Sequence, residues 1–355
     1  MHLTDIWFLL IAVLWTGYLV LEGFDFGVGM LLPAVAKDPV DRQVTLRTIG
    51  PVWDGNEVWL LVAGGATFAA FPLWYASLFS GFYLALLVIL VALIVRGLAL
   101  EYRNKLHDAA WHRRWDLAIV IGSAVPALLW GVALANIVRG VPLDAEHNYT
   151  GNFFTLLNPY ALLGGLTTLV LFALHGAIFL ALKTHGPVRD RARALVLPLG
   201  AATVPLAAGF LIWTQSYDGS WITWTLALLA AVCLVGGLLA SRVGRDGLGF
   251  IGTAATIVLA SATLFVTLYP NVLPSTTDPA FSLTTTNASS THYTLTIMTW
   301  VAVIFTPIVL LYQGYTYWVF RKRLTRDDIP QHSPAGPAPD TAPDPAADTA
   351  QAETA

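Results

Sequence analysis

The sequence predicts an all-α polytopic membrane protein with nine transmembrane helices. Of its 355 residues, 56% are hydrophobic and only 12% are charged, whereas about 25% of residues are charged in an average soluble domain. Several apolar runs exceed the roughly 18 residues that a spanning helix requires, for example residues 78–100 and 117–138. The basic residues, in addition, are concentrated in alternate connections between these runs.

The nine predicted spans are residues 6–33, 52–71, 77–100, 116–138, 159–183, 194–214, 220–241, 248–269 and 294–320. The first span has no basic segment before it and no small-residue cleavage pattern, so we interpret it as a retained helix and not as a signal peptide. We expect two four-helix bundles, at about 6–138 and 159–269, with the ninth helix at their periphery.

The basic residues predict the direction of the chain. Of the 19 Lys and Arg residues, all except Arg96 and Arg139 follow an odd-numbered span. Because basic residues concentrate in cytoplasmic loops, we expect the N-terminus outside and the C-terminus in the cytoplasm. The integral membrane domain is expected over residues 1–325. Residues 326–355, rich in Pro, Ala, Asp and Thr without apolar periodicity, predict a disordered cytoplasmic tail.

Carboxylates lie inside the predicted spans at two places. Glu22 and Asp25 are three residues apart, as are Asp54 and Glu57, so each pair shares a helix face. A charge at membrane depth costs roughly 2.5 kcal/mol or more, and such groups line a water path, pair with a cation or face a partner. With the predicted topology, both pairs lie in the cytoplasmic half of the membrane.

Arg96, Glu101 and His175 are expected at the same depth. Carboxylates and a histidine there are suited to passing protons inward from the cytoplasm, because desolvation and neighbouring charges tune their proton affinity. Structural pairing and a substrate site are the alternatives. In the structural alternative, Arg96 neutralises one of three carboxylates, Asp25, Asp54 or Glu57. His175 could equally be a hydrogen-bonded residue between helices.

The sequence shows no pattern for a redox centre or metal site in this chain. A bis-ligated haem or a copper site requires two or more His or Met ligands at matching depth, and His175 is the only histidine within a predicted span. The single cysteine, Cys233, cannot form a disulfide framework or a thiolate metal site within the chain. Nucleotide-binding and zinc-hydrolase motifs are absent, and we expect no nucleic-acid partner.

The residues described above closely resemble those of subunit II of the cytochrome bd quinol oxidases. The resemblance covers about residues 1–325. The most specific motif is Gly-Pro-Val-Trp-Asp-Gly-Asn-Glu-Val-Trp at 50–59, and the others lie at 23–27, 96–103, 175–177, 269–271 and 317–321. The resemblance implies a complex of the bacterial plasma membrane that oxidises a quinol and reduces dioxygen to water.

In that family, subunit I carries two b-type haems and one d-type haem, and subunit II packs against it and contributes to proton uptake from the cytoplasm. The resemblance implies a proton-path role for Asp54, beside Trp53, with Arg96 near the route. Asp25, Glu57, Glu101 and His175 lie in matching motifs.

The resemblance also implies membrane lipid and quinone around the complex. A structural quinone and a small single-span accessory subunit are compatible with it, although no residue here identifies either. Two other functions remain as alternatives. One is a proton-coupled secondary transporter with a site near the bilayer midplane, and the other is a purely structural membrane scaffold.

Overall fold

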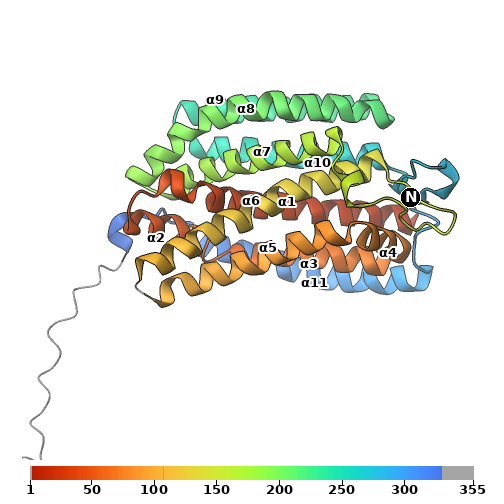
Figure 1. Cartoon of the computed structure of the whole chain (residues 1–355), viewed down its shortest axis with the longest axis horizontal. Helices are drawn as coiled ribbons and strands as arrows, with labels where there is room; N and C mark the ends of the chain where they lie inside the picture. Colours follow the sequence, from red (N-terminus) through yellow and green to blue (C-terminus); the bar gives the residue numbers. More distant parts are fainter. Residues whose placement is uncertain (1, 107, 330–355) are drawn as a thin grey trace, which may run out of the picture.

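Long helices that run side by side account for most of the chain (Figure 1). The computed structural model describes residues 2–106 and 108–329. The α-helices are α1 (Leu3–Val35), α2 (Pro39–Arg47), α3 (Trp53–Ala70), α4 (Pro72–Gly81), α5 (Tyr83–Tyr102), α6 (Ala109–Arg139), α7 (Pro159–Lys183), α8 (Pro187–Asp218), α9 (Trp221–Arg242), α10 (Asp246–Leu268) and α11 (His292–Val319). The connections contain the short 3-10 helices η1 (Arg103–Lys105), η2 (Phe153–Leu156), η3 (Pro279–Phe281) and η4 (Arg326–Asp328) and an antiparallel pair of strands, β1 (Asn271–Leu273) and β2 (Leu283–Thr284).

Within the described residues, eight helices are long and apolar enough to cross a membrane: α1, α5, α6, α7, α8, α9, α10 and α11. The expected polytopic helical membrane protein is thus observed. The predicted second span corresponds to α3, which is too polar to be counted with them. Its first turns contain Asp54, Asn56 and Glu57. The count of nine crossings and the direction of the chain therefore stay predictions.

Several helices differ from the predicted bounds. The predicted third span, 77–100, is divided, because α4 ends before Phe82 and α5 begins after it. The helices α6 and α8 begin several residues before their apolar segments. At the start of α6, Asp108 accepts a hydrogen bond from the backbone N–H of Trp111 at 2.7 Å. Such a cap provides an acceptor for a backbone N–H group of the first turn, which has no partner within the helix. A helix can therefore begin before the apolar run from which it was predicted.

Two glycines allow α1 and α7 to approach closely. A Cβ atom on Gly27 would lie 2.1 Å from the carbonyl oxygen of Phe172, and one on Gly176 would lie 2.5 Å from the backbone of Gly27. Small residues permit such contacts between membrane helices. Because α1 also packs against α3 and α6, it contacts helices from both predicted four-helix units, and the division into two units stays a prediction.

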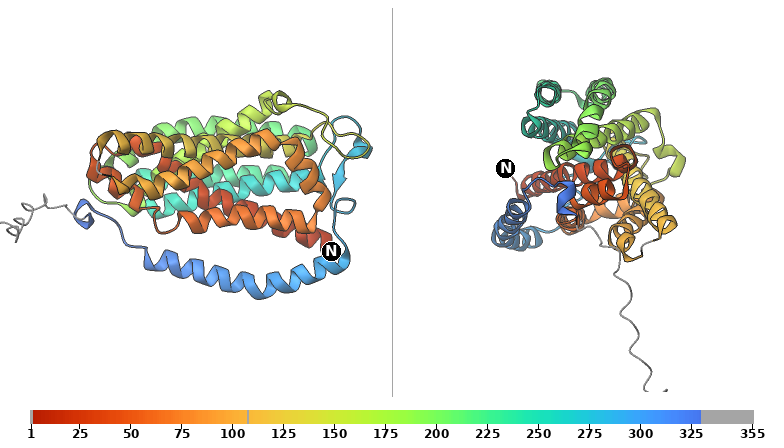
Figure 2. Two further views of the ribbon diagram at one scale, coloured as in Figure 1. Left: turned by 60° about the horizontal axis from the view of Figure 1, so that its bottom comes forward. Right: turned by 90° about the vertical axis from the view of Figure 1, so that its left-hand side faces the viewer.

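The helix α11 lies at the edge of the bundle, alongside α1 and α3 (Figure 2). Leu295 is its one buried residue. Near the start of α11, the indole N–H of Trp7 donates to the carbonyl oxygen of Leu295 at 3.2 Å. Farther along, the indole N–H of Trp59 donates to Gln313 Oε1 at 2.9 Å. This peripheral helix corresponds to the predicted ninth span.

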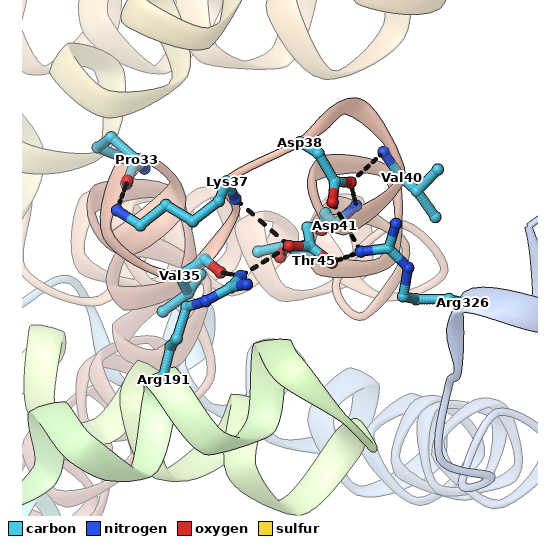
Figure 3. Close-up of polar contacts among 9 residues, drawn as sticks. All are labelled: Pro33, Val35, Lys37, Asp38, Val40, Asp41, Thr45, Arg191 and Arg326. Carbon is cyan, nitrogen blue, oxygen red and sulfur yellow. Dashed lines mark hydrogen bonds and ion pairs between the residues drawn. The ribbon is translucent and has the colours of Figure 1, made fainter.

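At the arginine-rich end of the bundle, buried Asp41 of α2 binds two arginines (Figure 3). Arg191 of α8 donates to Asp41 Oδ2 at 2.6 Å, and Arg326 of η4 donates to Asp41 Oδ1 at 2.6 Å. Arg326 also donates to Asp38 Oδ2 at 2.7 Å. The predicted start of the disordered tail at residue 326 is therefore too early. The remainder of that predicted tail, 330–355, lies outside the described residues.

Candidate functional site

The centre of the site is an ion pair between α5 and α1. Arg96 Nη1 donates to Glu22 Oε2 at 2.7 Å, and both side chains are fully buried. The guanidinium carbon of Arg96 also lies 4.8 Å from the centre of the Phe26 ring, a cation–π distance. If the polar groups have only a structural role, the expectation from the sequence is that Arg96 pairs with Asp25, Asp54 or Glu57. That expectation is wrong, because Glu22 occupies the position.

Asp25 has a different partner. Asn56 Nδ2 of α3 donates to Asp25 Oδ2 at 2.7 Å, and both residues are fully buried. Asn56 lies in the ten-residue motif between Asp54 and Glu57, but we did not identify it from the sequence. An amide carries no net charge and so does not stand out in an apolar segment as a carboxylate does. Its position next to Glu57 was the only feature of the sequence that could have indicated a role for Asn56 in the site.

Several polar atoms of this cluster have no partner among the described residues. They are Glu22 Oε1, Asp25 Oδ1 and the Nε and Nη2 atoms of Arg96. Buried polar groups in native proteins are nearly always hydrogen-bonded, so exceptions require an explanation. A carboxylate oxygen without a partner is free to accept a proton or a water molecule. Both buried acids therefore retain an atom at which proton transfer can occur.

The α3 acids lead from the surface of this chain toward the buried cluster. Asp54 is exposed, and its Oδ1 accepts the backbone N–H of Gly55 at 2.8 Å. Glu57 is half-buried and lies within electrostatic range of both Asp54 and Arg96. Three residues of helix correspond to about 4.5 Å of rise, so Glu57 is nearly one turn deeper than Asp54.

Trp53 forms part of the wall beside this line of acids. Its ring lies next to Gly97 of α5, where an added Cβ would be 3.4 Å from the Trp53 Cη2 atom. The absence of a side chain on Gly97 thus leaves space for the indole ring one residue from Arg96. The structure brings together Trp53, Asp54, Glu57, Asp25 and Arg96 in one region, with Glu22 and Asn56 added to them.

Two predicted candidates lie elsewhere. Glu101 is exposed, five residues beyond Arg96 on α5, and no ion pair involves it among the described residues. His175 is fully buried between helices, where its Nδ1 atom lies 2.7 Å from Thr253 Oγ1 of α10. Its ring stacks on Phe250 with the centroids 4.5 Å apart. This environment agrees with the alternative in which His175 is a hydrogen-bonded interhelical residue.

The described residues form no cluster of metal-ligating side chains. Residues 2–106 and 108–329 contain no group of three His, Cys, Asp or Glu side chains placed to hold a metal ion. Two apolar cavities, of about 470 and 270 Å³, have no His, Cys or Met in their linings. The Nε2 atom of His175 has no hydrogen-bond partner within residues 2–106 and 108–329. The ring is enclosed by Phe24 and Phe250 and borders neither cavity.

Comparison with known proteins identifies the family. Residues 3–320 match the family model of cytochrome bd terminal oxidase subunit II. The chain belongs to this family. Membership makes it part of an oxidoreductase complex of bacterial membranes, and the polytopic fold agrees with that location.

Individual members of the cytochrome bd subunit II family are similar over nearly their whole length. Cytochrome bd ubiquinol oxidase subunit 2 of Bacillus subtilis (strain 168) is 38% identical, over 92% of this chain and 98% of the relative. Cytochrome bd-I ubiquinol oxidase subunit 2 of Escherichia coli (strain K12) is 35% identical, over 92% and 97%. A probable cytochrome oxidase subunit 2 of Haemophilus influenzae is 39% identical, over 91% and 94%.

A solved structure shares the fold. A chain of the bd oxidase from Geobacillus thermodenitrificans superimposes with a TM-score of 0.73 at 18% sequence identity, covering 91% of this chain and all of that one. At this identity the likeness supports the helical architecture alone. The family assignment depends on the family model and on the sequence relatives.

Proposed function

We propose that this chain is the haem-free subunit of a bd-type quinol:dioxygen oxidoreductase and contributes to proton uptake from the cytoplasm. Reduction of dioxygen to water consumes protons, and these must reach a reaction site inside the membrane. The relatives named as ubiquinol oxidase subunits support a quinol as the electron donor. The haems, two b-type and one d-type, would be held by subunit I, as the resemblance of the sequence to subunit II implies.

The observation that carries the proton-path proposal is the gradient of burial along the acids. Asp54 is exposed, Glu57 is half-buried, and Asp25 and Glu22 are fully buried. Both buried acids have an oxygen without a partner among the described residues. A proton accepted at the edge of α3 could thus pass to groups of increasing depth.

The residues of the site differ in role. Asp54 would accept protons at the entry, with Trp53 limiting access from the side of α5. Glu57 would connect Asp54 to the buried acids of α1, Glu22 and Asp25, with which it interacts electrostatically. Arg96 would bind Glu22, and its positive charge would stabilise the ionised form of the neighbouring carboxylates. Neither Glu101 nor His175 contacts this line, so their participation rests only on the resemblance of their motifs.

Asp54→Asn tests the entry point. Asparagine keeps the size of the side chain but cannot carry a proton, so oxygen uptake by the complex should fall roughly tenfold or more. Haem content should remain normal, because Asp54 is exposed and Arg96 retains Glu22. Oxygen uptake and haem per complex are measured on the purified complex.

Asp218→Asn is the matched control, since Asp218 is exposed at the opposite end of the bundle. This substitution should leave oxygen uptake and haem content unchanged. Loss of haem in parallel with oxygen uptake would assign Asp54 a structural role. Normal values for both quantities would remove Asp54 from the path.

A further inference from the structure

The amide of Asn56 is held by the peripheral helix α11. Tyr317 donates its hydroxyl to Asn56 Oδ1 at 2.7 Å, and Gln313 Nε2 donates to the same oxygen at 3.3 Å. Gln313 Oε1 in turn accepts the indole N–H of Trp59 at 2.9 Å. These residues are one turn apart on α11 and face α3. The chain of hydrogen bonds ends at Asp25, to which Asn56 donates.

This arrangement permits one orientation of the Asn56 amide. With Oδ1 accepting from α11, Nδ2 is directed at Asp25 Oδ2. A flipped amide would direct its NH2 group at the NH2 group of Gln313 and its oxygen at the Asp25 carboxylate. Both contacts would be repulsive, since an amide nitrogen is only a donor and a carboxylate only an acceptor.

We propose that Tyr317 and Gln313 are positioning residues for Asp25 and act through Asn56. They fix the amide so that its donor occupies Asp25 Oδ2, which leaves Oδ1 as the atom where Asp25 takes up and releases a proton. This inference rests on the proposed proton-path function. It adds two residues from a different helix, neither of which carries a charge.

The placement of α11 supports this role. Most of this helix is exposed in the chain, yet it turns two polar side chains toward the bundle at the level of Asn56. A polar group in a membrane interior is favourable only when it finds a partner. Gln313 and Tyr317 find theirs in one residue, Asn56, which contacts the buried acid directly.

Tyr317→Phe tests the inference, because it removes one hydroxyl and keeps the ring. Oxygen uptake by the complex should fall about two- to tenfold, the effect of losing one hydrogen bond on a rate. The solvent isotope effect in D2O should increase, because a slowed proton step then limits turnover. Haem content should stay normal. Tyr315→Phe, an exposed tyrosine on the same helix, is the matched control and should change none of these values.

The comparison with Asp25→Asn separates this inference from the proposed function. If Tyr317 acts through Asp25, then Tyr317→Phe should have no further effect in the Asp25→Asn complex. An additive effect, or a normal rate for Tyr317→Phe beside a slow Asp25→Asn, would overturn the positioning role and leave the proton path intact. Normal turnover of Asp25→Asn with normal haem would instead overturn the role of Asp25 itself.

If the complex with Tyr317→Phe does not assemble, Gln313→Leu can be used to test the same inference. It removes the second donor to Asn56 at similar side-chain volume, and its effect should also vanish in the Asp25→Asn complex. An effect of Gln313→Leu that persists in that background would overturn the inference.

Discussion

At the scale of single residues, one buried acid of the site, Glu22, is the direct counter-charge of Arg96. Among the described residues, no ion pair within 4 Å involves Asp25, Asp54 or Glu57. The three acids are consequently available to exchange protons without removing the direct counter-charge of Arg96. This division explains how neutralising substitutions on α3 could affect turnover and leave the fold intact.

Glu22→Gln should have the opposite outcome to Asp54→Asn. It leaves the buried Arg96 without its counter-charge, and breaking a buried pair in this way costs roughly 3–5 kcal/mol. We expect less assembled complex and a lower melting temperature, measured by haem content and thermal unfolding. The double variant Glu22→Gln/Arg96→Gln should recover part of that loss, because no unpaired charge remains. Normal assembly of Glu22→Gln would contradict the structural role of the pair.

The sequence predicts these residues better than it predicts their contacts. Spacing of three residues identifies which acids share a face, as with Glu22 and Asp25. It does not show which other helix that face meets, and so Arg96 was assigned to the wrong carboxylates. Asn56 and Tyr317 were missed as site residues for a related reason. Uncharged polar residues are tolerated in apolar segments, so only three-dimensional contacts reveal their role.

At the scale of elements, the short polar helix α2 joins parts of the chain that are distant in sequence. Through Asp41 it binds α8 and η4 (Figure 3). Asp38 begins the helix by accepting the backbone N–H groups of Val40 and Asp41, each at 2.9 Å. Apolar periodicity cannot predict such an element, because tertiary ion pairs and caps define it.

The ionisation of Asp38 gives this element a pH dependence. The backbone N–H of Asp41, together with the Arg326 guanidinium, holds the pKa of Asp38 below its ordinary value. A group with a lowered folded-state pKa stabilises the fold above its unfolded-state pKa, and the contribution is lost as the pH falls through the folded-state pKa. Asp38 therefore contributes fully at neutral pH.

Asp41→Asn should loosen the junction among α2, α8 and η4. The amide keeps the shape but carries no charge and accepts only through one oxygen, so both arginines lose a charged acceptor and one of them loses its acceptor altogether. Removing one partner of a buried hydrogen bond costs roughly 1–3 kcal/mol, which thermal unfolding of the purified complex should detect. Asp327→Asn is the control, because Asp327 is exposed in the same 3-10 helix. Equal melting temperatures for the two variants would show that the junction does not stabilise the fold.

At the scale of the whole molecule, the structure gathers the basic connections at one end. Asp116 of α6 binds Arg42 and Arg103 there, and Asp246 of α10 binds Arg189. Apolar runs and loop charges were sufficient to predict this common end. They could not locate the break at Phe82 within the predicted third span, because both sides of it are apolar. Which side of the membrane this end faces remains a prediction from the distribution of charge.

Labelling of single cysteines tests that prediction. In a Cys233→Ala background, Glu146→Cys and Asp190→Cys place exposed thiols at opposite ends of the bundle. A membrane-impermeant maleimide should label Glu146→Cys on intact cells, and should label Asp190→Cys only after the membrane is opened. Both variants should retain oxygen uptake, which shows that the labelled complex is native. The reverse labelling pattern would place the exposed Asp54 on the outer side, and a path that begins there could not take protons from the cytoplasm.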